Sequence, residues 1–245
     1  MNRRWSMLLA VMMLASTVAC NNLPGRPAPV SDVLRPSQQT DFAALYAQNC
    51  AACHGPRGEG GAAIALAGPL YLATVSDQVL RSVTTDGIPG TPMPAFGQSA
   101  GGTLTVQQIA ALVDGIRKWV PAGAAEGVRP PSYVAGVPGE AKRGAIVYQS
   151  FCSSCHGPGG DGGKAAGSIV DPSFLALVSD QGLRTTVIFG RPELGAPDWR
   201  GDVPGHPMTD QEVSDVVAWM AAHRVPYPGQ PYPSGAGKSL QGGER

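Results

Sequence analysis

The chain contains the same five-residue pattern twice. Residues 50–54 read Cys-Ala-Ala-Cys-His, and residues 152–156 read Cys-Ser-Ser-Cys-His. Each copy continues through Gly-Pro into a glycine-rich run, HGPRGEGG in the first copy and HGPGGDGG in the second. Because the pattern recurs together with its flanking sequence, we interpret the chain as two repeats of one structural unit.

The pattern Cys-x-x-Cys-His is the attachment sequence of haem c. Two thiols one helical turn apart each add to a vinyl group of the porphyrin, and the histidine that follows gives the iron its proximal nitrogen. A zinc knuckle and a thioredoxin-like redox pair are the alternative interpretations of the Cys-x-x-Cys spacing. A zinc site would need further ligands nearby, and the chain has only His206 and His223 as histidines outside the two motifs.

With these two motifs each half of the chain resembles the class I cytochromes c, and the whole resembles a tandem di-haem member of that family. The resemblance covers roughly residues 40–120 and 139–224. It implies an all-α fold, with two cytochrome c-type haem domains in tandem and two covalently bound haem c groups. It also implies the residues that hold these groups: the thioether cysteines Cys50, Cys53, Cys152 and Cys155, and the proximal iron ligands His54 and His156.

The N-terminus has the features of a bacterial export signal. Arg3 and Arg4 form a positive n-region, and residues 7–18 form an apolar run that is too short to span a bilayer comfortably. Residues 17–20 read Thr-Val-Ala-Cys and resemble the lipobox of bacterial lipoproteins, although a threonine stands where an aliphatic residue is usual. We expect residues 1–20 to be a lipoprotein signal peptide that ends at a lipidated Cys20; ordinary cleavage beside an incidental free thiol is the alternative. The protein would then be lipid-anchored in the cell envelope, on the periplasmic side of a bacterial membrane.

Composition and helix signals divide the rest of the chain. We expect a Pro-rich tether at 21–40, a first cytochrome c domain at 41–121, a linker at 122–138, a second cytochrome c domain at 139–224 and a Pro/Gly-rich tail at 225–245. Apolar spacing predicts helices at 41–48, 76–83, 105–119 and 209–223. Two of these helices begin with the spacing of a capping box, formed by Thr105 with Gln108 and by Thr209 with Glu212.

Met93 lies between Pro92 and Pro94, in a loop between the middle and last helices of the first domain. A methionine is more often a core residue than a ligand, but this methionine is in a loop rather than on a helix. The family that the chain resembles takes its distal iron ligand from this place, so Met93 is the expected sixth ligand of the first haem. The family also implies that the carbonyl of Pro69 accepts the N–H of the His54 imidazole.

The two repeats align without a gap over their middle, at an offset of 103 residues. Gly87 falls on Gly190 at this offset, and Met93 falls on Ala196. The second domain therefore lacks a methionine at the place where the first domain has one, and we expect the two haems to be inequivalent.

Met208 is the nearest candidate for the sixth ligand of the second haem. Counted back from the last helix, however, Met208 matches Leu104, and a residue just before an N-cap usually packs as a hydrophobic staple. His206 is another candidate ligand. An open or otherwise filled site is the third possibility, and the sequence leaves all three open.

Net charge is zero, the pI is near 6.9 and no basic block occurs, so nothing indicates a nucleic-acid partner. No nucleophile–base pair or carboxylate pair stands out, and we expect an electron carrier rather than an enzyme. By family analogy, its redox partners would be proteins of a respiratory or photosynthetic chain: a membrane quinol-oxidising or dehydrogenase complex on one side, and an oxidase or soluble cytochrome on the other. The alternatives are a peroxidase-like or gas-sensing protein that uses an open second haem, and a fixed structural subunit of a larger dehydrogenase.

Overall fold

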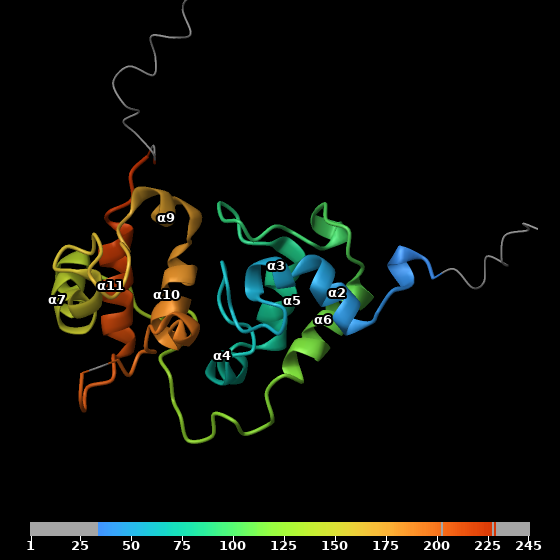
Figure 1. Ribbon diagram of the computed structural model, residues 1–245, viewed down its shortest axis with the longest axis horizontal. Helices are drawn as coiled ribbons and strands as arrows, with labels where there is room; N and C mark the ends of the chain where they lie inside the picture. Colours follow the sequence, from blue (N-terminus) through green and yellow to red (C-terminus); the bar gives the residue numbers. More distant parts are fainter. Residues whose placement is uncertain (1–33, 202, 227, 229–245) are drawn as a thin grey trace, which may run out of the picture. The chain divides into compact units, whose positions relative to one another are not determined.

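The computed structural model describes residues 34–201, 203–226 and 228 (Figure 1). The chain divides into a short unit that ends at Gln39 and a long unit that begins at Thr40. The expected signal peptide, the lipidation site Cys20, most of the tether and most of the tail lie outside the described residues, so these expectations stay predictions. Among the described residues, no helix is both long enough and apolar enough to cross a membrane.

The described part of the long unit consists of helices and loops, with two isolated bridges and no β-strand. The short unit contributes the 3-10 helix η3 (Pro36–Gln38). The first set of helices, blue to green in Figure 1, is α2 (Phe42–Asn49), α3 (Ala51–His54), α4 (Pro69–Thr74), α5 (Asp77–Asp86), η4 (Gln98–Ala100) and α6 (Val106–Arg117). The second set, yellow-green to red, is α7 (Ala141–Phe151), α8 (Ser153–His156), α9 (Pro172–Leu177), α10 (Asp180–Phe189), η5 (Pro192–Leu194) and α11 (Asp210–Ala221). The two sets have the same order of elements, which confirms the all-α fold and the internal repeat.

The helix starts that the sequence predicts are present. The side chain of Ser76 caps α5, which runs three residues further than expected. Thr105 and Gln108 form a reciprocal capping box at the start of α6, and Thr209 and Glu212 form one at the start of α11. Each box satisfies two backbone N–H groups that have no partner within the helix. Local sequence therefore fixes where the last helix of each set begins.

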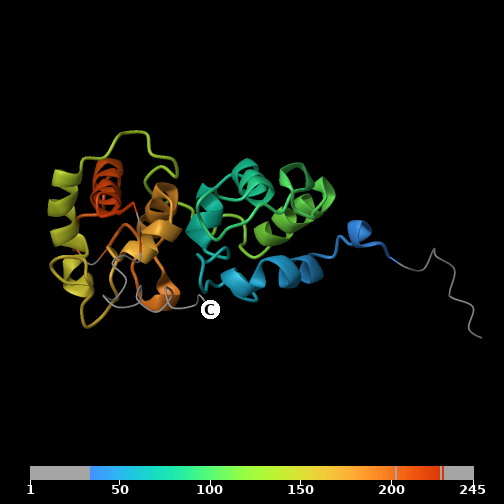
Figure 2. The same ribbon diagram turned by 90° about the horizontal axis from the view of Figure 1, so that it is seen from above.

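In each set the first and last helices cross at a glycine. Gly115 on α6 lies under the ring of Phe42, and a Cβ at this glycine would come within 2.0 Å of the ring. Gly144 on α7 lies against α11, which Figures 1 and 2 both draw beside it, and a Cβ there would be 2.0 Å from the carbonyl oxygen of Asp215. In the repeat, Phe42 corresponds to Gly144, and Gly115 corresponds to Trp219. The bulky and the small residue have thus exchanged helices, and both crossings remain close.

An arginine near the end of the last helix secures each set at equivalent places. Arg117 and Arg224 each donate to two backbone carbonyls at the end of the third helix and to the aspartate that begins the fourth helix. The partners are Leu72, Val75 and Asp77 in the first set, and Leu175, Val178 and Asp180 in the second. Each partner in the first set lies 103 positions before its equivalent in the second set, whereas the two arginines are 107 positions apart. Two different positions therefore supply one interaction, which satisfies carbonyls that a helix end leaves unpaired.

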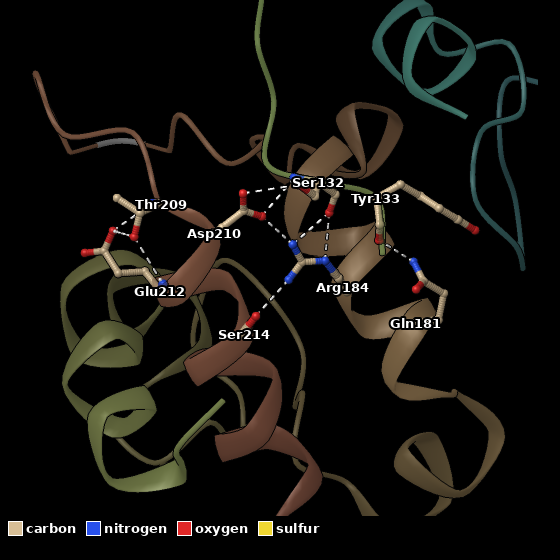
Figure 3. A network of polar contacts seen from close by, with 8 residues as sticks. All are labelled: Ser132, Tyr133, Gln181, Arg184, Thr209, Asp210, Glu212 and Ser214. Atoms are coloured by element: carbon tan, nitrogen blue, oxygen red, sulfur yellow. Dashed lines mark hydrogen bonds and ion pairs between the residues drawn. The ribbon is translucent and has the colours of Figure 1, made fainter. Parts of the chain in front are cut away.

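The linker is held on the second set by a buried arginine (Figure 3). Arg184 on α10 is 2% exposed and donates to the carbonyl oxygen of Ser132 at 2.9 and 2.7 Å. It also donates to Oγ of Ser214 at 3.0 Å and to a carboxylate oxygen of Asp210 at 2.6 Å. Each nitrogen of the buried guanidinium therefore has at least one partner, as a buried charge requires.

Replacing Arg184 by alanine should lower the free energy of unfolding of the second domain by about 2–4 kcal/mol, because several hydrogen bonds to a buried charged group are lost together. Arg81, its equivalent in the first repeat, is the matched control: its side chain is 41% exposed and pairs with Asp114 at 3.5 Å. The change Arg81→Ala should cost less than about 1 kcal/mol. Native-state hydrogen exchange of the amides of α11 and α6 in the holoprotein measures the two domains separately. Equal losses in the two variants would contradict this account of the linker.

Candidate haem sites

Each motif forms one tight turn at the end of the first helix of its set. Cys50 is both the C-cap of α2 and the N-cap of α3. The amides of Cys53 and His54 bond to the carbonyl of Cys50 at 3.2 and 3.0 Å. The amides of the second motif bond to the carbonyl of Cys152 at the same two distances. Both motifs therefore present two thiols and an imidazole from one compact turn.

The chemistry of these thiols argues against the two alternative interpretations of the motif. The four motif cysteines form no disulfide, and no group of three or more histidine, cysteine or acidic side chains that could hold a metal ion occurs among the described residues. Burial, and then the neighbouring cysteine, raises the pKa of Cys50 and that of Cys152 to about 11. A redox-active Cys-x-x-Cys pair has a lowered thiol pKa instead. Neither a zinc knuckle nor a thioredoxin-like pair fits this environment.

A backbone carbonyl holds the imidazole of each motif. Nδ1 of His54 lies 2.9 Å from the carbonyl oxygen of Ile64, and Nδ1 of His156 lies 2.7 Å from that of Gly167. Since a carbonyl can only accept, Nδ1 carries the proton and the lone pair of Nε2 is available to a metal. Burial lowers the pKa of His54, which favours the neutral, ligating form. Two thiols and such a nitrogen at each turn fit a covalently attached haem.

The expectation for Pro69 is wrong. The carbonyl that accepts from His54 belongs to Ile64, five residues earlier, and Pro69 is the first residue of α4. Proline is favoured at this first helical position, where its carbonyl is committed to the helix. No side-chain signal marks Ile64 as the acceptor, because any residue supplies a backbone carbonyl.

A tyrosine that the sequence does not mark as functional braces each turn. The hydroxyl of Tyr46 donates to the carbonyl of the glycine directly after the first motif at 2.8 Å, and the hydroxyl of Tyr148 makes the equivalent bond in the second. The ring of Tyr46 meets Trp119 edge-on at 4.8 Å, whereas the ring of Tyr148 stacks on Trp219 at 4.1 Å. These contacts fix the chain just after each histidine. They tie it to α11 in the second set and to the residues just after α6 in the first.

Met93 lies in the loop after α5, where it is partly exposed. Its carbonyl accepts from the amide of Ile88 at 3.0 Å, and its amide donates to Oγ1 of Thr91 at 3.2 Å. Gly87 allows the loop to come close, since a Cβ there would be 2.8 Å from the Met93 carbonyl oxygen. The loop that carries the expected ligand is therefore held by local backbone contacts.

The second set repeats this loop with Ala196 in place of the methionine. The carbonyl of Ala196 accepts a hydrogen bond from the amide of Arg191 at 3.0 Å. The amide of Ile88 makes the equivalent bond to the carbonyl of Met93, and both residues of this pair lie 103 positions earlier in the chain. A Cβ at Gly190 would likewise be 2.7 Å from the carbonyl oxygen of Ala196. The structure thus gives Ala196 the position of Met93, as the alignment of the repeats predicts.

Met208 occupies a different place. It is 6% exposed and belongs to the apolar cluster that contains Val147, Tyr148, Ile188, Trp199, Val213 and Val216. Its amide bonds to the carbonyl of Trp199 at 2.8 Å, as the amide of Leu104 bonds to that of Phe96 at 2.7 Å. Met208 therefore stands where the first repeat has Leu104, just before the capping box, and this placement favours the staple over the ligand.

His206, the other candidate, lies near the surface. Its side chain is 55% exposed, and Nε2 is 2.9 Å from a carboxylate oxygen of Glu212. The same glutamate accepts the amide of Thr209 at 2.8 Å in the capping box. The structure thus pairs the imidazole of His206 with a helix cap.

Two equivalent sets of helices, each with a thiol–thiol–imidazole turn, define a tandem cytochrome c. The family profile "Cytochrome C oxidase, cbb3-type, subunit III" matches the chain twice, at residues 37–114 and 139–220. The chain therefore belongs to this family; it is a di-haem c-type cytochrome with two covalently bound haem c groups, as the sequence predicts.

Two further comparisons are more limited. The cbb3-type cytochrome c oxidase subunit CcoP of Azospirillum sp. (strain B510) is 32% identical over 133 residues, which are 50% of this chain and 40% of that protein. The match thus spans less than half of the relative's length. A chain of the Kuenenia stuttgartiensis reducing HAO-like protein complex is 18% identical, with a TM-score of 0.41, over 79% of this chain and 100% of that chain. A likeness at this level supports no conclusion.

Proposed function

We propose that this di-haem cytochrome carries electrons in the bacterial cell envelope. It passes them from a membrane quinol-oxidising or dehydrogenase complex to an oxidase or a soluble cytochrome. The duplicated thiol–thiol–imidazole turn is the observation that carries the proposal, because it provides two one-electron centres in one chain. The similarity to a subunit of a cbb3-type oxidase supports a respiratory chain as the setting.

The motif residues fix the two cofactors in this proposal. The four thioether cysteines are Cys50, Cys53, Cys152 and Cys155, and the proximal ligands are His54 and His156. Bound haem supplies the one-electron redox couple. The chain supplies ligation and orientation: the carbonyls of Ile64 and Gly167 hold the imidazole protons on Nδ1 and direct Nε2 to the metal.

Met93 completes the first site as the distal ligand. The loop contacts to Ile88 and Thr91 support this role, because they fix the backbone on both sides of the thioether-bearing residue. A thioether stabilises ferrous iron and so raises the reduction potential. The first haem is then the higher-potential centre of the two, other factors being equal.

The signal peptide and a lipid on Cys20 place the protein on the periplasmic side of the membrane. Haem c is attached outside the cytoplasm in bacteria, which agrees with export. The Pro-rich tether at 21–40 would act as a spacer between the lipid and the haem domains.

Reductive titration of the full-length holoprotein tests the carrier function. We expect reversible uptake of one electron per haem, followed by reoxidation by bacterial membranes that contain a cbb3-type oxidase, with cyanide-sensitive oxygen consumption. Reoxidation by hydrogen peroxide in catalytic turnover, with no transfer to such membranes, would support the peroxidase-like alternative and contradict the proposal.

A second test concerns the anchor. Wild-type protein should fractionate with membranes, and Cys20→Ala should be released or remain unprocessed, because several acyl chains anchor a protein stably. Cys20→Ser retains the size of the side chain and serves as a second variant without a lipid acceptor thiol. A wild-type protein that is already free of membranes in gentle lysates would overturn the lipid anchor.

A further inference from the structure

We propose that the second haem has an exchangeable sixth position, which takes a small neutral diatomic ligand when the iron is ferrous. The inference rests on the proposed assignment of the two haem sites. It goes beyond electron transfer, because it gives one of the two haems a binding site of its own. The observation behind it is the structural equivalence of Ala196 with Met93.

The equivalence is closer than a sequence alignment alone provides. The amide five residues before Ala196 bonds to the Ala196 carbonyl, and the amide five residues before Met93 bonds to the Met93 carbonyl, both at 3.0 Å. A glycine precedes each of these amides and makes the same close approach to the loop. The second loop differs in between, where it forms the 3-10 helix η5 (Pro192–Leu194), but it has kept the closing bond to this residue. The side chain at that position has lost the donor atom, since a methyl group cannot ligate iron.

The chain does not offer Met208 as a substitute from an equivalent loop. The amide of Met208 makes the same backbone hydrogen bond as the amide of Leu104 in the first repeat, and the Met208 side chain is packed in the apolar cluster of the second set. A ligating Met208 would have to leave that cluster, and the apolar area that it buries there opposes the move. The hydrophobic staple at the start of α11 would be lost at the same time.

The remaining histidines are also engaged. His206 is paired with Glu212, and its release would take a partner from the capping box of α11. Nδ1 of His223 lies 2.9 Å from the carbonyl oxygen of Trp219, and its ring packs against that indole at 4.7 Å. Among the described residues, each histidine outside the motifs thus has another role.

The loop around Ala196 suits the binding of a diatomic gas better than the cleavage of peroxide. Trp199 is 5% exposed, and the guanidinium of Arg200 lies 5.1 Å from its ring. Nε of Arg200 donates to both carboxylate oxygens of Asp198, at 2.9 and 3.1 Å. The charged groups beside Ala196 neutralise each other, so neither is a free acid or base for cleaving an O–O bond. A diatomic gas needs only the open position on iron.

Carbon monoxide is the probe, and the full-length holoprotein is the sample. We expect the reduced wild type to bind one carbon monoxide per chain without denaturant, while the ferric protein has one low-spin haem with the sulfur-to-iron charge-transfer band and one haem without it. Met208→Leu, which copies the residue of the first repeat, should change neither result. Ala196→Met should abolish carbon monoxide binding and double the charge-transfer band. Ala196→Leu is the control of similar size without sulfur, and it should not increase the band.

A wild type that binds no carbon monoxide and has two low-spin haems would overturn the inference, whichever residue fills the site. Met208 is the ligand if Met208→Leu removes half of the charge-transfer band or creates carbon monoxide binding. Either result would also overturn the inference. Met93→Ala separates this outcome from a failure of the proposed site assignment: it should remove the band and add a second carbon monoxide. If Met93→Ala leaves the band unchanged, the assignment of the first site fails. If Ala196→Met fails to load haem, the wild type and Met208→Leu still decide.

Discussion

The hydrogen bond from each motif imidazole to a backbone carbonyl is the contact on which both sites depend. It fixes the tautomer, and it requires the loop after the motif to fold back over the turn that it has just left. The glycine-rich run makes this return possible: a Cβ at Gly61 would come within 2.9 Å of the carbonyl oxygen of Cys53, and one at Gly163 within 2.4 Å of that of Cys155. The amide of Gly61 then bonds to Ala63 at 3.0 Å, which directs the loop toward Ile64. The run that follows each motif is therefore part of the iron site, although it contributes no ligand.

The two repeats preserve this geometry with different residues around it. The crossing of the first and last helices pairs Phe42 with Gly115 in one repeat and Gly144 with Trp219 in the other. The aromatic ring against the bracing tyrosine comes from Trp119 in the first repeat, and from Trp219 in the second. Dense interiors require that volume be conserved at a contact rather than at a sequence position. The position of the distal ligand is the opposite case, because the hydrogen bond to its carbonyl is the same in both repeats and the side chain is not.

The parts of the structure that depend on local chemistry were predictable. The capping boxes of α6 and α11, the motif turns and the alignment of Met93 with Ala196 follow from spacing along the chain. Contacts between distant segments were not predictable in the same way. The arginines at the ends of the last helices make equivalent bonds from unmatched positions, and the acceptor for His54 is a carbonyl that carries no sequence signal. The burial of Arg184 depends on where the linker runs, which composition alone does not specify.

The central claim is that each motif turn holds one haem through two thioether bonds. The mass of the denatured full-length holoprotein tests it most directly, since a covalent group stays with the chain after unfolding. The account predicts the mass of the mature chain plus two haems, with a loss of one covalent haem when both cysteines of a single motif are replaced by alanine. A gain of one haem in the wild type, or haem that acid–acetone extracts from the chain, would contradict it.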